Sequence, residues 1–175
     1  MTDSKVVLYI AASLDGFIAA EDGSLDWLTV HDGQGADFGY GAFYGSIGSM
    51  LMGRKTYEFV ARSGDWPHAD RPAYVLSTTR DTLEHVAVRR GEIDAVLDEL
   101  VAAHGRVWLV GRGGLVVQAL RAGRLDEIIL TVVPIILGRG LRLFDGDAGR
   151  IELRHLETST WPGGLVQTRY AVGRS

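Results

Sequence analysis

Residues 51–58 read LMGRKTYE, a stretch in which a buried strand passes into a helix through a single glycine. Residues 49–52 are mostly apolar and too few for a helix, which is typical of a strand buried on both faces, and a helix is expected over 55–61. The N–H groups and the dipole at a helix start favour an anion, and Arg54, Lys55 and Thr56 add positive charge and a hydroxyl donor. The stretch therefore indicates either a phosphate-binding turn or an ordinary strand-to-helix turn with solvated basic residues.

Residues 110–114 read VGRGG and have the same layout, a glycine turn between an expected strand at 106–110 and an expected helix at about 115–122. Glycines let the backbone approach a pyrophosphate closely, although the GxGxxG spacing of the Rossmann fold is absent. A glycine turn can also be purely conformational. Two such turns at the carboxyl ends of strands favour a phosphate-binding edge, because open α/β sheets bind their ligands there.

Strands and helices alternate through most of the chain, which predicts an α/β fold with a mostly parallel central sheet flanked by helices. Apolar residues recur at helical spacing through 93–101, with Gly105 where a C-terminal glycine belongs. Near the end of the chain, two stretches flank a Trp-Pro-Gly-Gly turn of type II, so an antiparallel C-terminal hairpin should close the sheet at its edge. The expected strands are 6–12, 49–52, 73–77, 106–110, 127–137, 151–160 and 165–172.

Two glycine-bearing regions allow more than one interpretation. Residues 33–48 hold six glycines among four aromatic residues. Each interior glycine costs a helix about 1 kcal/mol relative to alanine, so this region is either a tightly packed helix or a mobile aromatic loop. The turn dipeptides Asp15-Gly16 and Asp22-Gly23 bound a segment that is either a flap over a site or only a connection.

The length, composition and charge exclude several classes of protein. At 175 residues, 46% of them apolar, the chain is expected to form one domain, 1–175. The net charge of −4 gives no sign of the positive charge that binds nucleic acid. The lack of cysteine excludes disulfides, thiolate catalysis and Cys-based zinc sites. No secretory signal or membrane-spanning run occurs, which favours a soluble, cytoplasmic protein. The five histidines lack metal-binding spacing, so we expect them on the surface and expect no metal site.

The order of these pieces resembles the dihydrofolate reductase superfamily, and more closely its branch related to the C-terminal reductase domain of the bifunctional riboflavin-biosynthesis protein. The resemblance covers nearly the whole chain and implies a dihydrofolate-reductase-like fold. The segments that carry it are Ala12–Ala19, Leu51–Glu58, Tyr74–Ser77, Val110–Gly114, Leu125–Glu127 and Pro134–Gly138. As an ordered set they are specific for the fold and much less specific for the substrate.

The resemblance implies NADPH as the cofactor, held by the two glycine turns. By position, Arg54 would pair with the 2′-phosphate, and Lys55 with Thr56 would lie at the pyrophosphate. A flap of residues 15–19 would lie near the nicotinamide, with Trp27 packed behind it. The implied cofactor-binding residues are Ala12, Ile18, Gly53, Arg54, Lys55, Thr56, Ser77, Thr78, Gly111, Arg112, Gly113 and Gly114.

Asp37 stands fifteen residues before Met52, a spacing similar to that of the substrate-binding carboxylate in dihydrofolate reductases. Thr131 matches the hydroxyl that supports that carboxylate, so the resemblance implies Asp37 and Thr131 as the catalytic pair. One carboxylate can accept from adjacent ring and exocyclic nitrogens of a pterin or aminopyrimidine, and it can supply or orient a proton. The alternative is that Asp37 is a solvated loop residue.

Two departures from the family bear on function. Arg112 stands where the family usually has glycine, and the Cys/His signature of a zinc deaminase is absent. We therefore expect at most the reductase half: NADPH-dependent reduction of a small pyrimidine- or pterin-like heterocycle, resembling 5-amino-6-(5-phosphoribosylamino)uracil reductase. The alternatives are a dihydrofolate or dihydropterin reductase and a non-catalytic NADPH- or ligand-binding protein of the same fold. The apolar run at 132–137 and the habit of the family predict a homodimer, with a small-molecule partner and neither nucleic acid nor membrane.

Overall fold

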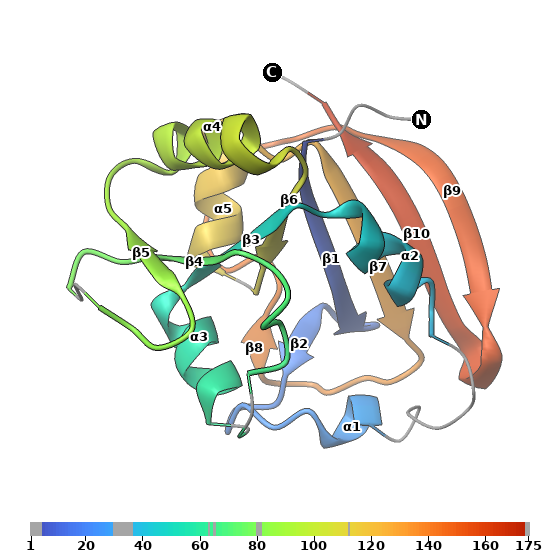
Figure 1. Cartoon of the computed structure of the whole chain (residues 1–175). Coiled ribbons are helices and arrows are strands. Elements are labelled where there is room, and N and C mark those ends of the chain that lie inside the picture. The colour runs from blue at the N-terminus through green and yellow to red at the C-terminus, as the bar shows by residue number, and fades with distance from the viewer. Residues whose placement is uncertain are drawn as a thin grey trace.

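The computed structural model describes residues 5–29, 37–62, 64, 66–79, 82–111 and 113–173. At its centre lies a sheet of eight strands in the order β5-β4-β3-β6-β1-β7-β10-β9 (Figure 1). Neighbours from β5 to β7 in that order run parallel, and β10 runs antiparallel to both of its neighbours. The strands of this sheet are β1 Val6–Ser13, β3 Ser49–Gly53, β4 Ala73–Leu76, β5 Ala87–Arg89, β6 Val107–Val110, β7 Glu127–Val133, β9 Leu153–Trp161 and β10 Leu165–Val172. A small second sheet pairs β2 Phe17–Ala19 with β8 Leu141–Arg142.

Helices cover both faces of the large sheet. Successive side chains of a strand point to opposite faces, so Leu51 packs in the cluster under α4 and α5, whereas Met50 and Met52 pack under α2 and α3. A smaller cluster joins Trp27 of α1 to the ends of β7 and β10. Burying one such side chain contributes about 1.5–3 kcal/mol to the stability of the folded protein. These layers therefore hold the elements around the strand ends in place. The helices are α1 Asp26–Thr29, α2 Tyr40–Ser46, α3 Arg54–Ala61, α4 Ile93–His104 and α5 Gly114–Arg121, with a short 3₁₀ turn at Pro162–Gly164.

The predicted mostly parallel sheet and its C-terminal hairpin are confirmed. In the hairpin, Gly163 has the φ of 79° that a type II turn requires after proline. The strand predicted at 127–137 is wrong beyond Val133, because Pro134 has no N–H for a ladder and the N–H of Ile135 turns back to the Val133 carbonyl at 2.8 Å. The short strands β2, β5 and β8 were not predicted, since two or three residues are too few to show a periodic pattern.

The described part of the glycine-rich region forms a packed helix, α2, rather than a loop. Gly41 and Gly45 lie within it, yet Phe43 is buried and stacks on Tyr9 with ring centroids 4.4 Å apart. Tyr40 packs edge-on to Trp108 at 6.0 Å. Aromatic pairs of this kind contribute about 0.5–1.5 kcal/mol each beyond their buried area, which offsets the cost of the two glycines. Within the described residues, no helix is both long enough and apolar enough to cross a membrane.

Candidate active site

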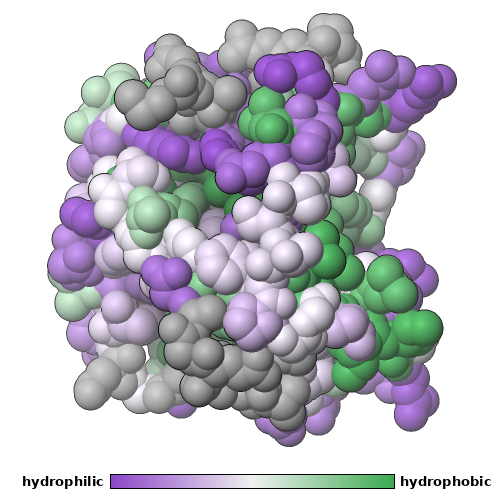
Figure 2. Space-filling model, turned by 90° about the vertical axis from the view of Figure 1, so that its right-hand side faces the viewer, coloured by the Kyte–Doolittle hydropathy of each residue, from purple (hydrophilic) through white to green (hydrophobic). Residues whose placement is uncertain are grey.

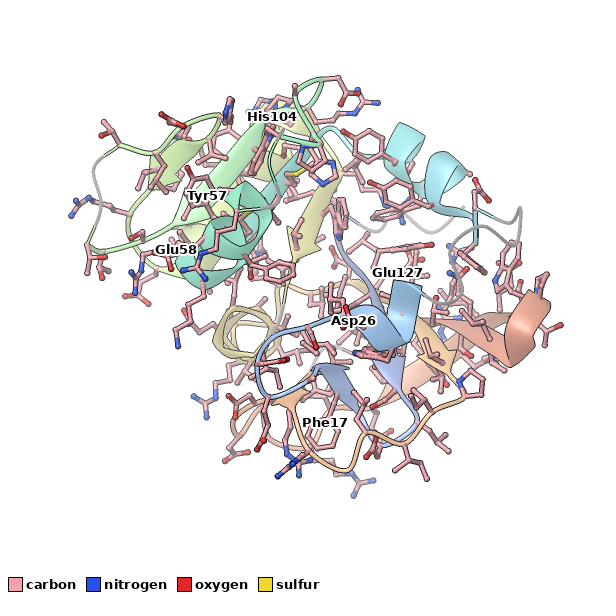
Figure 3. The ribbon with its side chains drawn as sticks, turned by 90° about the horizontal axis from the view of Figure 1, so that it is seen from below. Phe17, Asp26, Tyr57, Glu58, His104 and Glu127 are labelled. Carbon is pink, nitrogen blue, oxygen red and sulfur yellow. The ribbon has the colours of Figure 1, made fainter. Side chains whose placement is uncertain are left out.

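The predicted cofactor residues converge on one edge of the sheet. Because β1, β3, β4 and β6 are parallel, their carboxyl ends meet at the lower edge in Figure 1, which Figure 3 views from below. In Figure 3, Glu58 lies on α3 and Phe17 lies beside β2, at separate places along this edge. The predicted residues follow the strands in turn: Ala12 near the end of β1, Gly53 to Thr56 after β3, Ser77 and Thr78 after β4, and Gly111, Gly113 and Gly114 after β6.

The two glycine turns touch each other. Gly111 has a φ of +107°, and a Cβ atom built on it would clash with the side-chain oxygen of Thr56. The Thr56 side chain therefore packs directly on the Gly111 backbone, which requires glycine for both its conformation and its close approach. Arg112, between the glycines, lies outside the described residues.

Both helices that begin at this edge start without a side-chain cap. α3 follows Gly53 and α5 follows Gly113, whose φ of 60° and ψ of −127° suit only glycine. The first N–H groups of a helix have no partner within the helix, so here they remain available to an anion. This cradle of two helix starts and a glycine backbone fits the pyrophosphate of a dinucleotide.

Charged and hydroxyl side chains surround the cradle, although they have partners of their own. Arg54 forms an ion pair with Glu58 at 3.0 Å, and a bound phosphate would compete with that carboxylate. Lys55 is exposed. Ser77 is buried and its hydroxyl accepts the N–H of Thr79 at 3.3 Å. Arg90 donates to the carbonyl of Thr78 at 3.2 Å, which places a second cation at the end of β4. We did not identify Arg90 from the sequence because the strand before it, β5, is too short to predict.

The predicted flap is anchored at both ends. The Asp15 carboxylate accepts hydrogen bonds from the Ser13 hydroxyl at 2.7 Å and from the N–H groups of Leu137 and Gly138 at 3.1 and 2.7 Å. The bond from Ser13, followed by those from the backbone, lowers the pKa of Asp15 below its usual value of 3.8. Ile18 packs against the cluster under α5 while its strand, β2, pairs with β8. Trp27 packs on the ends of β7 and β10, and the cluster that holds it contains those strand ends rather than residues 15–19.

Asp37 caps α2 and is held by backbone donors. Its two carboxylate oxygens accept the N–H groups of Gly39 and Gly41 at 2.9 and 3.1 Å, and its carbonyl accepts the N–H of Tyr40 at 2.8 Å. Its carboxylate is exposed. An exposed, oriented carboxylate at a helix start can still accept hydrogen bonds from a ligand through its remaining lone pairs.

Thr131 is buried, and its hydroxyl accepts a hydrogen bond from the Gln167 amide rather than bonding directly to Asp37. The Gln167 amide nitrogen lies 3.0 Å from the Thr131 hydroxyl, 3.0 Å from the Phe38 carbonyl and 3.3 Å from the Tyr9 hydroxyl. The two predicted catalytic residues are thus connected through Gln167 and Phe38. Burial raises the pKa of the Tyr9 phenol by more than the hydrogen bond from Gln167 lowers it, and the nearby Asp37 charge adds to the rise, so that phenol stays protonated at neutral pH.

Aromatic side chains line the sheet face beside α2. Tyr9, Tyr40, Tyr44, His68 and Trp108 follow one another at centroid distances of 5.5 to 6.0 Å. Tyr44 donates to Asp70 at 2.6 Å, and burial followed by this bond raises the pKa of Tyr44. Burial among the rings lowers the pKa of His68, so the expectation that every histidine lies on the surface is wrong here, and His104 is half-buried too.

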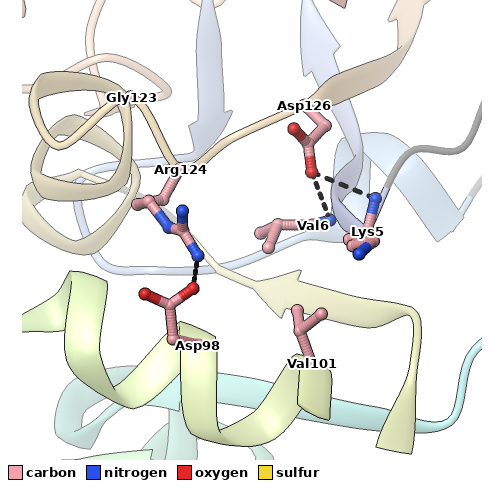
Figure 4. Close-up of a pocket in the computed structure, with 7 residues that line it drawn as sticks. All are labelled: Lys5, Val6, Asp98, Val101, Gly123, Arg124 and Asp126. Carbon is pink, nitrogen blue, oxygen red and sulfur yellow. Dashed lines mark hydrogen bonds and ion pairs between the residues drawn. The ribbon is translucent and has the colours of Figure 1, made fainter.

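A hollow of about 350 Å³ lies at the opposite, amino edge of the sheet (Figure 4). Arg124 forms an ion pair with Asp98 there, and Asp126 accepts the N–H groups of Lys5 and Val6 at 3.0 and 2.9 Å. Arg124 and Asp98 pair with each other, Asp126 binds backbone N–H groups, and all of them lie away from the predicted site residues. The hollow is therefore not the candidate active site.

Comparisons with known proteins agree with this arrangement. Residues 4–166 match the family model described as the RibD C-terminal domain. The uncharacterized protein YwjB of Bacillus subtilis (strain 168) is 38% identical over 172 residues, which cover 96% of this chain and 98% of YwjB. The crystal structure of a putative riboflavin biosynthesis protein from Shewanella sp. PV-4 matches with a TM-score of 0.90 at 29% identity, over 97% of this chain and 99% of that chain.

Two more distant structures support the fold alone. A diaminohydroxyphosphoribosylaminopyrimidine deaminase/5-amino-6-(5-phosphoribosylamino)uracil reductase from Thermotoga maritima has a TM-score of 0.73 at 16% identity, over 97% of this chain and 57% of that chain. A dihydrofolate reductase from Enterococcus faecalis, complexed with NADP(H), has a TM-score of 0.66 at 17% identity, over 97% and 96%. The dihydrofolate-reductase-like fold and the resemblance to the riboflavin-biosynthesis reductase domain are both confirmed.

Proposed function

Because the chain belongs to the RibD C-terminal domain family, we propose that it is an NADPH-dependent reductase of a small pyrimidine- or pterin-like heterocycle. The observation that carries the proposal is the contact between the two glycine turns, where Thr56 packs on Gly111. That contact joins two uncapped helix starts into one cradle for a pyrophosphate. The nearest reaction by family is that of 5-amino-6-(5-phosphoribosylamino)uracil reductase, in which a ribosyl group is opened to a ribityl chain.

In this proposal the cofactor end of the site binds NADPH through positively charged side chains and backbone N–H groups. The helix starts at Gly53 and Gly113 donate N–H groups to the pyrophosphate, with Lys55 beside them. Arg54 exchanges its Glu58 partner for the 2′-phosphate, and Arg90 adds positive charge at the end of β4. NADPH, when bound, supplies the hydride.

At the substrate end, Asp37 binds and orients the heterocycle. Its carboxylate keeps lone pairs free beyond those that accept Gly39 and Gly41, and it accepts from adjacent ring and exocyclic N–H groups of the substrate. The same carboxylate orients the substrate proton donor that complements hydride addition, or, when it is protonated, supplies that proton itself. Tyr9 and Tyr40 present aromatic surface beside it on which a planar ring can pack.

The test is an assay of NADPH consumption with a panel of aminouracil ribosyl phosphates, dihydropterins and dihydrofolate. We expect turnover with at least one aminopyrimidine and little with NADH. Turnover with dihydrofolate or dihydropterin alone would favour a dihydrofolate or dihydropterin reductase instead. Binding of NADPH without oxidation by any member of the panel would contradict an enzyme and favour a binding protein of this fold.

We also propose that the protein forms a homodimer through the apolar surface formed by the residues that follow β1 and β7. Leu14 and Ile136 are 66% and 71% exposed, and the N–H of Leu14 donates to the Ile135 carbonyl at 2.8 Å, so they project from one surface. Figure 2 shows apolar surface gathered at the lower right of the side that carries β9 and β10. Exposed apolar patches mark association sites more often than isolated apolar residues do. Light scattering at micromolar concentration should give twice the 19.0 kDa chain mass, and a monomer would contradict the proposal.

A further inference from the structure

Gln167 is a buried polar residue of β10 to which the sequence pattern assigned no role. It lies in register with Thr131 of β7 and Ser159 of β9, and its side chain points into the face covered by α2. Only 9% of the residue is exposed. An amide nitrogen placed so deeply must donate its two hydrogens within the protein, because an unpaired buried donor is costly.

The Gln167 amide nitrogen bonds to the backbone beside Asp37 and to side chains of two strands, β1 and β7. The nitrogen lies 3.0 Å from the Thr131 hydroxyl and 3.0 Å from the Phe38 carbonyl, the residue that follows Asp37. Tyr9 donates its hydroxyl to the same carbonyl at 2.8 Å. Gln167 therefore ties the turn that carries Asp37 to two strands at the centre of the sheet.

The turn needs such an anchor because its backbone is strained. Phe38 has a φ of +53° and Gly39 a φ of +76°, and a bulky residue rarely adopts the left-handed region. With the hydrogen bond from Tyr40 N–H to the Asp37 carbonyl, these angles form a turn of type I′. This backbone places the N–H groups of Gly39 and Gly41 against the Asp37 carboxylate and so determines where that carboxylate points.

We propose that Gln167 is a positioning residue for the reaction: its amide holds the Phe38 carbonyl, and through that turn it orients the Asp37 carboxylate toward the substrate. The inference rests on the proposed function, in which Asp37 binds the heterocycle. The Phe38 carbonyl can only accept, so a carboxylate of the same shape at position 167 would face this oxygen atom without a proton to share. Thr131 then acts as the fixed point on β7 against which Gln167 is held.

Two variants and a control separate positioning from general stability. Gln167→Glu keeps the shape and removes the donors, and Gln167→Met keeps the length without polarity. Thr168→Val on the same strand is the control, because it removes only the 3.4 Å contact between Thr158 and Thr168 on the exposed surface. For each variant we would measure amide hydrogen exchange of Gly39 and Gly41, the Kd for NADPH, and kcat and KM for the substrate.

We expect both Gln167 variants to exchange the Gly39 and Gly41 amides at least about tenfold faster, as local opening of the turn becomes easier. In the same variants kcat should fall by roughly 10–100-fold, since misplaced catalytic groups lose rate steeply, while the Kd for NADPH stays unchanged. Thr168→Val should match the parent in all of these measurements.

Unchanged exchange at Gly39 and Gly41 in both variants would overturn the anchoring role. Faster exchange with the parental kcat would overturn the link to the reaction. If the parent reduces no substrate, the proposed function fails, and the exchange measurement still decides whether Gln167 holds the turn.

Discussion

The two ends of the candidate site are built in different ways. The proposed cofactor cradle is formed by two short stretches of sequence, 53–56 and 111–114, each of which lies between a strand and a helix; Arg112 in the second stretch is outside the described residues. The acid-bearing turn depends on residues from three distant strands, β1, β7 and β10, and 129 positions separate Phe38 from Gln167. A site made of local backbone geometry can be identified from a motif, whereas a site made of long-range side-chain contacts can be identified only in part. The following variants test that difference, beginning with the largest expected effect.

Asp37→Asn should produce the largest loss. The amide keeps the size of the side chain but removes the charge and one acceptor, so turnover should fall by roughly 10²–10⁴-fold while NADPH affinity remains intact. Asp22→Asn is the matched control, because Asp22 also caps its own turn, accepting the Ser24 N–H at 2.8 Å. Steady-state kinetics and NADPH titration would check both. A parental rate in Asp37→Asn would place the chemistry on another group.

Arg54→Ala should remove most of the preference for NADPH over NADH. A charge-assisted contact to the 2′-phosphate contributes about 1.5–3 kcal/mol, or roughly ten- to a hundredfold in Kd. Glu58→Gln is the complementary variant, since it releases Arg54 from its 3.0 Å ion pair and should leave NADPH binding equal or tighter. Calorimetric titration with both cofactors measures the effect. Equal affinity for NADH and NADPH in the parent would rule out this role for Arg54.

Gly111→Ala should lower the free energy of unfolding by more than the penalty for placing alanine in a left-handed backbone. Gly23 has a φ of +86° and open space where a Cβ atom would stand, with nothing within 4 Å, so Gly23→Ala should cost only the conformational penalty of about 1–2 kcal/mol. Gly111→Ala adds a clash with Thr56, so it should reduce the free energy of unfolding further and weaken NADPH binding. Denaturant unfolding and NADPH titration would compare the two. Equal costs in the two variants would show that the turns are not in contact.

Asp15→Asn should have the smallest effect and should depend on pH. Hydrogen bonds from Ser13 and from the loop at 137–138 lower the folded-state pKa of Asp15 below 3.8, so the folded protein favours the carboxylate. That stabilisation is fully present above the unfolded pKa of about 3.9 and is lost as the pH falls through the folded pKa. The stability difference between parent and variant should therefore be present at neutral pH and shrink in acid. A difference that does not change with pH would contradict this role of the Asp15 charge.

Much of the architecture could be predicted because it follows from local patterns. The β3-to-α3 turn, the helix over 93–104 and the hairpin around Gly163 depend on apolar spacing and on glycine or proline at defined positions. The strand predicted through Leu137 was wrong beyond Val133, because Pro134 lacks a backbone donor although the apolar composition continues. The helix α2 could not be decided, because the aromatic packing that offsets its glycines comes from β1 and β6.

The sequence by itself determined the order of the longer strands and of the helices α3, α4 and α5, and it identified the two glycine turns, because both depend on residues that are neighbours in the chain. Only the tertiary structure decided that Thr56 packs on Gly111 and that Arg90 joins the end of β4. It also decided that Gln167, rather than Thr131 directly, reaches the turn of Asp37. Those contacts join side chains to backbone atoms across the sheet, and no pattern along the chain encodes the distance between them.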